Sequence, residues 1–478
     1  MANRFTTDVM LGGIAQIIVS IESLILLPFL TKYLGAAGYG MLAQITVTIM
    51  VLSMLAELGL TKSIIRFLAG KTDKNEISRE FFAVFFFCLI TGLIVSAFLF
   101  FFAEPFTALF LKNIFAASLF KIAAFLLLFN ILVECMMAFF TAFRHIKSYL
   151  LLQATQTLGQ ITLIVYLLFK GYGLKEVVLA YLSVKLFIFL FSLLILKTKI
   201  QLRAPNLSAL KPHLKFCIPI APLALFSWII HSSDIYFISF FYGAEKVGIY
   251  SVVYMFSKVI FLIMGPILLV LFPAVSKEWD DKNFKQVRVL LSYSIKYFLL
   301  FAIPATVGLI VMGKDILRIL TSQAFVSGYV LFPFIATGLV IWKLADLLSI
   351  ILLSTKNTKT IGKTYLIGAV ANIALNFLLI PQYSILGAAA ATILSYMLVF
   401  LMMLKSTYGF KFDWNLGFIA KSIFASIIMA FIVKLIPVAT LIGLIASMVA
   451  GIFVYFVVIL LIKGINKTEL NSLFSFKH

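Results

Sequence analysis

Apolar segments of about 20 residues or more follow one another along almost the whole chain, with short polar connections between them. A helix needs about 20 apolar residues to cross a bilayer, so each segment predicts one membrane-spanning helix. We place the spans at residues 9–32, 42–65, 81–103, 116–142, 148–169, 174–196, 215–241, 248–274, 290–312, 328–352, 361–381, 384–405, 417–436 and 439–462. The pattern therefore predicts an all-α polytopic membrane protein with about 14 transmembrane helices. A count of 12 spans is the main alternative, since spans four and thirteen are the least distinct.

The longest polar connection before the middle of the chain, residues 197–214, contains two prolines and divides the spans into groups. We predict an N-lobe in residues 1–197 with spans one to six, and a linker in residues 198–214. A C-lobe in residues 215–407 holds spans seven to twelve. Residues 408–478 hold spans thirteen and fourteen and a cytoplasmic tail.

A short pattern of small residues recurs six spans apart. Residues 35–40 and residues 243–248 both read G-A-x-x-x-G, and each follows the first span of its lobe. This echo favours two six-span repeats in parallel orientation, an arrangement that transporters use. Chance recurrence of small residues is the alternative.

Composition narrows the class of protein. Of the 478 residues, 63% are hydrophobic and 12% charged, and the formal net charge is +21. A soluble chain would carry about twice that charged fraction, and a disordered one would lack the apolar content. The chain is too apolar for its positive charge to indicate a nucleic-acid partner.

The positive charge alternates between successive connections. One set of connections is rich in Lys and Arg: Lys71, Lys74, Arg79, Arg144, Lys147, Lys197, Lys199, Arg203, Lys211, Lys277, Lys282, Lys285, Arg288, Lys356, Lys359, Lys405, Lys411, Lys463 and Lys467. The opposite set is about three times poorer, with Lys32, Lys112, Lys170, Lys175, Lys246 and Lys314. The positive-inside rule then places both termini in the cytoplasm and gives an even number of spans.

Ionisable side chains inside the spans are the candidates for function, because each costs about 2.5–3.5 kcal/mol on insertion scales and is expected to face protein or water. The acids are Glu22, Glu57, Glu134, Asp234 and Asp346, and His231 is the one histidine within a span. The bases are Lys62, Lys185, Lys258, Lys296 and Lys343. The cations would attract an anionic head group such as a diphosphate. Glu22, Glu57, Asp234, Asp346 and His231 are candidates for coupling to H+ or Na+. For Lys62, Lys185 and Lys296, snorkelling toward the interface is the alternative.

Spacing adds detail within single spans. His231 and Asp234 are three residues apart and share a helix face, and Lys343 and Asp346 have the spacing of an ion pair. Lys258 has Tyr254 four residues before it, which predicts an aromatic ring under the cation.

Amide side chains form stripes on spans five and eleven: Gln153, Gln156 and Gln160, and Asn372 and Asn376. Such stripes can bind sugar hydroxyls, but hydrogen bonding between neighbouring helices is the favoured interpretation.

Cysteine and catalytic patterns point away from an enzyme. Cys88, Cys135 and Cys217 are isolated in apolar stretches, which favours three buried thiols over a disulfide framework or a zinc site. The chain has no HExxH and no GxSxG motif, so we expect no enzyme activity and no cofactor.

Several segments together resemble a known family. Residues 27–35 (LPFLTKYLG) with Gly38-Tyr39-Gly40, Asp234 followed by residues 247–251 (VGIYS), and residues 372–381 (NIALNFLLIP) with 387–392 (GAAAAT) carry the resemblance. They resemble the polysaccharide-exporter branch of the multidrug/oligosaccharidyl-lipid/polysaccharide superfamily, and the match extends over both halves of the chain. The resemblance implies two six-helix lobes forming a V-shaped cavity, two peripheral C-terminal helices, and alternating access.

The resemblance also implies an O-antigen flippase of the bacterial inner membrane. Its substrate would be an undecaprenyl-diphosphate-linked oligosaccharide, a precursor of O-antigen lipopolysaccharide or a similar surface polysaccharide. Transport would be coupled to H+, Na+ or the membrane potential, and contact with polysaccharide polymerase machinery is expected. The alternatives are a drug/cation antiporter of the same superfamily, a membrane-embedded polysaccharide polymerase or glycosyltransferase, and a non-transporting scaffold.

Overall fold

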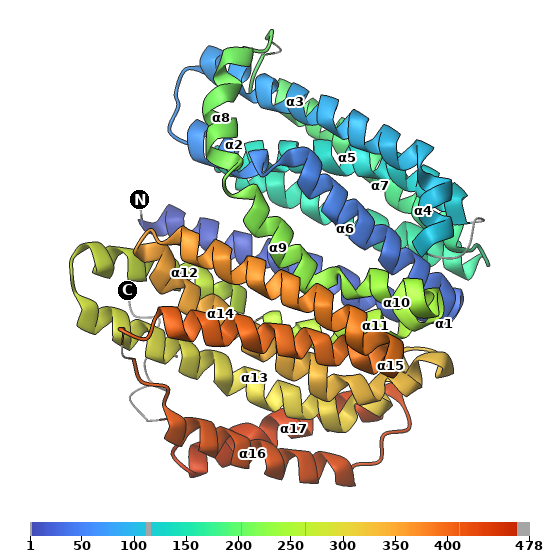
Figure 1. Ribbon diagram of the computed structural model, residues 1–478, viewed down its shortest axis with the longest axis vertical. Coiled ribbons are helices and arrows are strands. Elements are labelled where there is room, and N and C mark those ends of the chain that lie inside the picture. Colours follow the sequence, from blue (N-terminus) through green and yellow to red (C-terminus); the bar gives the residue numbers. More distant parts are fainter. Residues whose placement is uncertain (1, 111–115, 202, 263, 411, 466–478) are drawn as a thin grey trace. The chain divides into compact units, whose positions relative to one another are not determined.

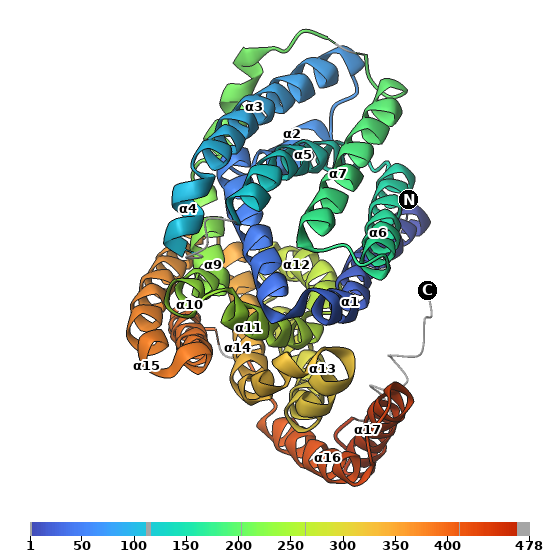
Figure 2. The same cartoon turned by 90° about the vertical axis from the view of Figure 1, so that its right-hand side faces the viewer.

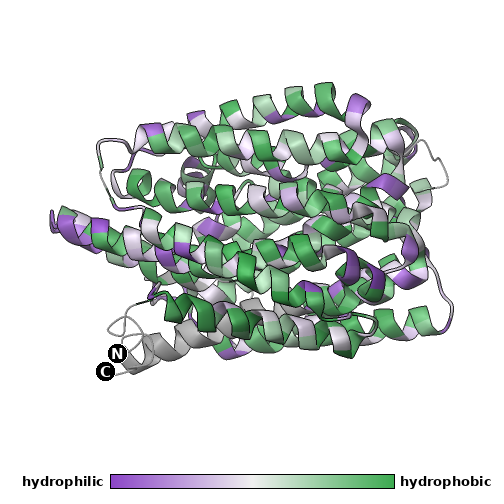
Figure 3. Cartoon of the chain, turned by 90° about the horizontal axis from the view of Figure 1, so that it is seen from below, coloured by the Kyte–Doolittle hydropathy of each residue, from purple (hydrophilic) through white to green (hydrophobic). Residues whose placement is uncertain are grey.

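The computed structural model describes residues 2–110, 116–201, 203–262, 264–410 and 412–465. All secondary structure in these residues is helical. The chain forms two compact units, Met1–Gly248 (unit 1) and Ile249–His478 (unit 2). Most of each long helix is coloured as hydrophobic in Figure 3. The all-α polytopic membrane fold expected from the sequence is confirmed.

Unit 1 contains helices that come from the first half of the chain (Figure 1). They are α1 (Ala2–Glu57), α2 (Leu60–Leu68), α3 (Lys74–Phe101), α4 (Ala103–Phe110), α5 (Ala117–Ala142), α6 (Ile146–Phe169), α7 (Leu174–Lys197), the 3-10 helix η2 (Leu207–Ala209), α8 (Leu210–Cys217), α9 (Ala221–Ser232) and α10 (Asp234–Tyr242). Helix α11 (Ala244–Ser257) begins in unit 1 and ends in unit 2. The lobe boundaries predicted at residues 197 and 215 remain a prediction.

Unit 2 contains the remaining helices. They are the 3-10 helix η3 (Lys258–Phe261), α12 (Met264–Asp280), α13 (Phe284–Leu320), the 3-10 helix η4 (Gln323–Leu331), α14 (Phe332–Ser354), α15 (Thr358–Ser406), α16 (Leu416–Leu435) and α17 (Leu441–Leu461). Helices α16 and α17 pack against each other and against α13, at the edge of this unit (Figure 1). They are the two C-terminal helices that the sequence places outside the second lobe.

Ten helices among the described residues are long and apolar enough to cross a membrane, or eleven if the bent pair α8–α9 is one span. Two of the ten contain a reversal and hold two predicted spans each (Figure 1). Gly35 divides α1 with φ 67° and ψ −177°, and Ser384 divides α15 with φ 53° and ψ −136°. The predicted span at residues 248–274 falls on α11, η3 and α12, with residue 263 outside the described residues.

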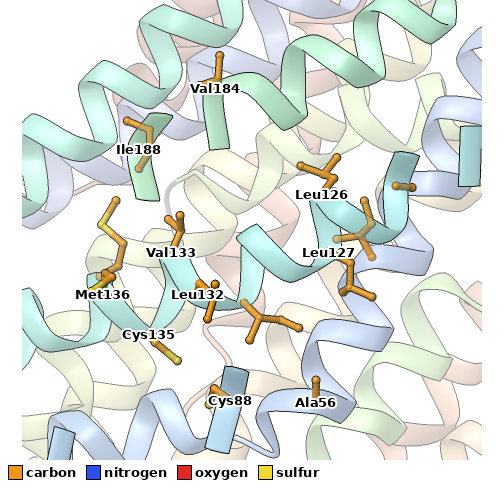
Figure 4. Close-up of a cluster of buried hydrophobic side chains, with 14 of the residues drawn as sticks. Ala56, Cys88, Leu126, Leu127, Leu132, Val133, Cys135, Met136, Val184 and Ile188 are labelled. Atoms are coloured by element: carbon orange, nitrogen blue, oxygen red, sulfur yellow. The ribbon is translucent and has the colours of Figure 1, made fainter. Parts of the chain in front are cut away.

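The core of unit 1 is a continuous apolar cluster between α1, α3, α5 and α7 (Figure 4). Helix α5 lies at its centre, since Leu127, Ile131 and Cys135 are all fully buried. Cys88, Cys135 and Cys217 are free thiols and all three are buried, which confirms their predicted role as small core residues.

The second predicted span ends earlier than the sequence suggests. We expected it to reach residue 65, but α1 ends at Glu57 and a new short helix, α2, begins at Leu60. Gly59 between them has φ 80°, a left-handed conformation that glycine adopts without steric cost. Lys62 therefore lies on α2, exposed, and not inside the span.

The two G-A-x-x-x-G segments have the same backbone geometry and pack against each other within unit 1. Gly243 has φ 80° and ψ −179°, close to the values of Gly35. A Cβ on Gly40 would lie 1.8 Å from the Ala244 carbonyl oxygen, and a Cβ on Gly248 would lie 2.1 Å from that of Ala36. The contact is reciprocal, and only glycine fits at either position.

Lys- and Arg-rich connections of unit 1 gather at the same end of its helices. The Asn206 N–H donates to the Arg79 carbonyl at 3.3 Å, which brings the linker to the start of α3. His145, before α6, lies in the electrostatic field of Lys199, after α7, and burial followed by that charge lowers its pKa. The alternating charge pattern requires the Lys- and Arg-rich connections to lie at one end of the spans, and these contacts of unit 1 agree with that. Lys112, Lys411 and Lys467, which belong to the same charge analysis, lie outside the described residues.

We call the contact between residues 35–40 and residues 243–248 the glycine crossing. It predicts that two Gly→Ala substitutions differ in their effect on stability. Gly40→Ala forces the two backbones apart, and overpacking of this kind lowers stability by about 1–3 kcal/mol. The control is Gly308→Ala in α13, where a Cβ meets no atom within 4 Å, so the melting temperature should stay or rise because alanine is the better helix former. Thermal unfolding of the solubilised protein measures both, and equal melting temperatures would contradict the crossing.

Candidate functional site

Four of the predicted intramembrane charges of unit 1 form one group around Lys185 of α7. This side chain is 8% exposed. Glu134 of α5 and Glu22 and Glu57 of α1 are the acids whose charges act on it, in that order of strength. Glu134 was recognised in the sequence as an intramembrane acid without an assigned role, and the structure joins it to the predicted residues. We call these four residues the acidic group.

Two hydroxyl groups complete the acidic group. Thr157 of α6 donates its hydroxyl hydrogen to Glu22 Oε2 at 2.9 Å, and Thr61 at the start of α2 donates to Glu57. One lysine leaves two of the three carboxylates uncompensated if all are ionised. Uncompensated charge inside a membrane protein is strongly unfavourable, so the group is suited to take up a proton or a small cation.

The glutamine stripe lies on α6, the helix that also carries Thr157. Gln160 is buried, and Gln153 and Gln156 are half-buried. Helix α6 packs against α1 and α7, which hold members of the acidic group. The stripe is therefore in position to hydrogen-bond neighbouring helices, while its contact with sugars remains a prediction.

Unit 2 brings two predicted lysines to one neighbourhood. Lys343 Nζ lies 2.7 Å from Asp346 Oδ2, so the ion pair predicted from the i, i+3 spacing is confirmed. The same ammonium lies 4.3 Å from the centre of the Phe261 ring, in the short helix η3 that begins with Lys258. Asp346 also accepts hydrogen bonds from Tyr365 and Trp342.

A chain of aromatic rings links this ion pair to Lys258. Lys258 Nζ lies 5.2 Å from the centre of the Tyr254 ring, which confirms the predicted cation over a ring. The Tyr254 and Tyr396 hydroxyl oxygens are 3.0 Å apart, and the Tyr396 and Trp342 rings are 5.2 Å apart. We call this set, from Lys258 through the rings to Lys343 and Asp346, the lysine–aromatic group.

The asparagine stripe of α15 connects its two halves. Asn376 Nδ2 donates to Asn372 Oδ1 at 3.0 Å, and Asn372 Nδ2 donates to Ser395 Oγ at 3.3 Å across the reversal at Ser384. Both asparagines have no exposed surface. This geometry supports the helix–helix interpretation of the stripe.

The other predicted residues lie elsewhere. Asp234 begins α10 and is 1% exposed, and it accepts a hydrogen bond from the Ile235 N–H at 2.9 Å. His231 is half-buried one turn earlier, near the end of α9. Lys296 is 8% exposed, with Nζ 5.2 Å from the centre of the Phe418 ring of α16.

Unit 1 also has an apolar cavity of about 270 Å³ between α1, α3, α4, α9 and α10. Its lining residues are Thr48, Val51, Leu52, Phe98, Leu99, Phe106, Phe110, Trp228 and Tyr236. The Thr48 and Tyr236 hydroxyl oxygens lie 2.8 Å apart at its wall. Hydrocarbon is the chemistry that such a lining accepts.

Family models match both parts of the chain. A model described as polysaccharide biosynthesis protein matches residues 5–279, more than half of the chain. A model described as MatE matches residues 219–378.

Two curated relatives come from Haloferax volcanii. The probable low-salt glycan biosynthesis flippase Agl15 is 27% identical over 256 residues, which are 52% of this chain and 53% of that protein. The probable flippase AglR is 29% identical over 174 residues, which are 36% of this chain and 35% of that protein. The chain spans about half the length, or less, of the curated relatives that it matches.

Solved structures with the same fold include transporters of two kinds. The inward closed conformation of the lipid II flippase MurJ aligns with a TM-score of 0.77 at 20% identity, covering 96% of this chain and 99% of that one. An inward-facing multidrug resistance transporter of the MATE family aligns with a TM-score of 0.68 at 14% identity, covering 83% and 97%. At these identities the likeness shows the fold.

The half-buried ion pair Lys343–Asp346 predicts a measurable coupling. In a double-mutant cycle of Lys343→Met and Asp346→Asn, each single variant leaves one polar partner unsatisfied, so the double variant loses less than the sum by about 1 kcal/mol or more. The control is the pair Arg318–Asp315, which has the same spacing and the same 2.7 Å distance but side chains 49% and 33% exposed. Its coupling should be about 0.2–0.5 kcal/mol. Thermal unfolding measures both cycles, and equal couplings would contradict a special role for the first pair.

Proposed function

The chain belongs to the polysaccharide biosynthesis protein family, and from that membership we propose that it is a flippase for lipid-linked glycans. The observation that carries the proposal is the lysine–aromatic group, in which two cations, Lys258 on the short helix η3 and Lys343 on α14, lie within one aromatic neighbourhood. A glycan on a diphosphate carrier brings charge that hydrocarbon rejects, so its carrier protein needs cations that can reach it. Lys258 is exposed and Lys343 is half-buried, so both ammonium groups are accessible to such a head group. The names of the Haloferax relatives support the same substrate class.

We further propose that the substrate is an undecaprenyl-diphosphate-linked oligosaccharide of a bacterial surface polysaccharide. Lys258 and Lys343 would bind the diphosphate, and Lys62, Lys185 and Lys296 remain candidates along the path. The membrane would be the bacterial inner membrane, with both termini in the cytoplasm as the charge pattern predicts. The lipid tail would stay in hydrocarbon while the head group passes by alternating access.

The ion pair means that a phosphate has to compete with Asp346 for Lys343. In the structure, the Lys343 ammonium is paired with the Asp346 carboxylate. An incoming phosphate would take the place of Asp346 and release the carboxylate toward Tyr365 and Trp342, which already donate hydrogen bonds to it. Substrate binding would thus exchange one ion pair for another, and departure of the substrate would restore the first.

The acidic group favours a second candidate function, a drug/cation antiporter. Carboxylates inside a membrane protein attract cations, and a MatE model matches residues 219–378. In the flippase the same group would bind the coupling H+ or Na+, together with the candidates Asp234, Asp346 and His231. The two functions differ in the charge of the cargo, which makes them separable by experiment.

Lysine substitutions test the flippase. Lys258→Gln and Lys343→Gln should each lower the flipping rate of a fluorescent polyprenyl-diphosphate sugar in proteoliposomes at least about tenfold, because each removes a charge-assisted contact of about 1.5–3 kcal/mol. Lys314→Gln is the control: Lys314 is exposed like Lys258 and also lies near a tyrosine ring, 5.9 Å from that of Tyr329, but it is not part of the lysine–aromatic group. Unchanged flipping in both test variants would exclude this binding site, and protection of cells from cationic dyes would favour the antiporter.

Carboxylate substitutions test ion coupling. Glu57→Gln and Asp234→Asn should abolish the acceleration of flipping by an imposed H+ or Na+ gradient, while slow downhill exchange remains. Glu245→Gln, at an exposed position of α11, should respond to the gradient like the unmodified protein. The initial rate with and without the gradient is the measurement, and a normal gradient response in both test variants would remove these residues from the coupling mechanism.

A further inference from the structure

The connection that follows α7 lies along the start of α3 within unit 1 (Figures 1 and 2). The Asn206 N–H donates to the Arg79 carbonyl at 3.3 Å, and the Ser78 hydroxyl donates to the Gln201 carbonyl. These two bonds hold the chain on either side of Arg203. The backbone therefore keeps Arg203 of the connection and Arg79 of α3 close to each other.

A polar cavity of about 430 Å³ lies between these two segments. All the residues that line it are charged or carry a side-chain amide. The charged ones are two bases, Arg79 and Arg203, and three acids, Asp73, Glu76 and Glu80. Which of these charges are available to a ligand depends on how they are already paired.

The three acids have partners within the protein. Lys71 Nζ, in the connection between α2 and α3, lies 2.6 Å from Glu76 Oε1 and 2.5 Å from Glu80 Oε1. The Asp73 carboxylate accepts from the Asn75 N–H at 2.8 Å and so caps the N-terminus of α3. None of these partners is an arginine, so the acids of the cavity do not neutralise its guanidinium groups by direct contact.

The two arginines lack an acidic partner. Within the part of the chain that the structure describes, neither Arg79 nor Arg203 forms an ion pair. Arg203 Nη2 donates to Gln201 Oε1 at 3.4 Å, which is long for a hydrogen bond. Both side chains are exposed. Two like charges at one cavity repel each other, and an anion bound between them would remove that repulsion.

An amide group adds a further donor to the cavity. Asn206 Oδ1 accepts from the Ser208 N–H at 3.2 Å and from the Ser208 hydroxyl at 2.7 Å. The Asn206 NH2 group has no hydrogen-bond partner among the described residues. The available groups are thus two guanidinium forks and one amide donor. Guanidinium forks match the oxygen atoms of a phosphate, and a tetrahedral phosphate presents oxygens to several donors at once.

We propose that Arg79 and Arg203 form a binding site for a phosphate group at the Lys- and Arg-rich end of unit 1. The charge pattern predicts this end to be cytoplasmic, and Arg79 lies just before the predicted start of the third span at residue 81. At that depth the phosphate belongs either to the head group of a membrane phospholipid or to a soluble phosphate compound. The bound group bridges α3 and the connection after α7. The inference does not depend on the identity of the transported molecule.

Binding to the full-length protein in neutral detergent tests the site with two probes. Native mass spectrometry measures binding of phosphatidylglycerol, and phosphorus NMR measures binding of inorganic phosphate at constant ionic strength. The double variant Arg79→Gln/Arg203→Gln should lower the affinity about tenfold or more for the probe that matches the natural source, because charge-assisted hydrogen bonds are lost. Arg79→Lys/Arg203→Lys keeps the charge without the fork and should give an intermediate affinity.

The control variant is Arg144→Gln/Lys147→Gln, which removes the same charge from two exposed side chains in another Lys- and Arg-rich connection. Its affinity should equal that of the unmodified protein. A loss for the lipid alone identifies a phospholipid head group, and a loss for inorganic phosphate alone identifies a soluble ligand. All variants should keep the melting temperature because the substituted side chains are exposed. The proposal is overturned if the unmodified protein binds neither probe saturably, or if the test and control variants have equal affinities for both.

Discussion

Hydrocarbon does not solvate charge or backbone polar groups, and the structure of this protein is organised around that constraint. Every long segment is helical because a helix satisfies its own backbone hydrogen bonds. Charges inside the spans then need partners from other helices or water. Lys185 meets carboxylates from α1 and α5, and Lys343 meets Asp346 and an aromatic ring. Grouping gives these ionisable residues partners, which lowers the cost of holding each of them within the membrane.

The charged groups of the two units have opposite signs. Unit 1 has an excess of carboxylates around one lysine, and unit 2 has lysines supported by aromatic rings. The first arrangement suits a small cation and the second suits an anion. In the proposed flippase these would be the coupling ion and the diphosphate. One chain would then bind both charged species that a coupled transporter moves.

The sequence predicted those features that arise within one helix. Apolar runs located the long helices, and the i, i+3 spacing predicted the Lys343–Asp346 pair that the structure confirms. The contacts between distant helices could not be read in this way. Glu134 and Lys185 are about 50 residues apart in sequence, and no periodicity links two helices that pack only in the folded unit.

Helix breaks were the other feature that the apolar pattern concealed. Leu58 and Gly59 end the second span while the surrounding residues stay apolar, so hydropathy alone extended the span to residue 65 and placed Lys62 inside it. Ser384, which reverses α15, is equally inconspicuous in sequence. The roles of the individual site residues could not be predicted either, because they depend on the transported molecule.

The glycine crossing bears on how such a chain could have arisen. Gly40 faces Ala244 while Gly248 faces Ala36, so the two segments make equivalent contacts with each other. That reciprocity is the geometry of an isologous interface, in which two identical subunits meet across a two-fold axis. In an ancestral homodimer a single glycine would have served both sides of the contact. If duplication and fusion of a gene joined two such subunits, the two positions would have become separate in sequence, and each would still have to remain glycine because the backbone of the opposite segment leaves no room for a side chain.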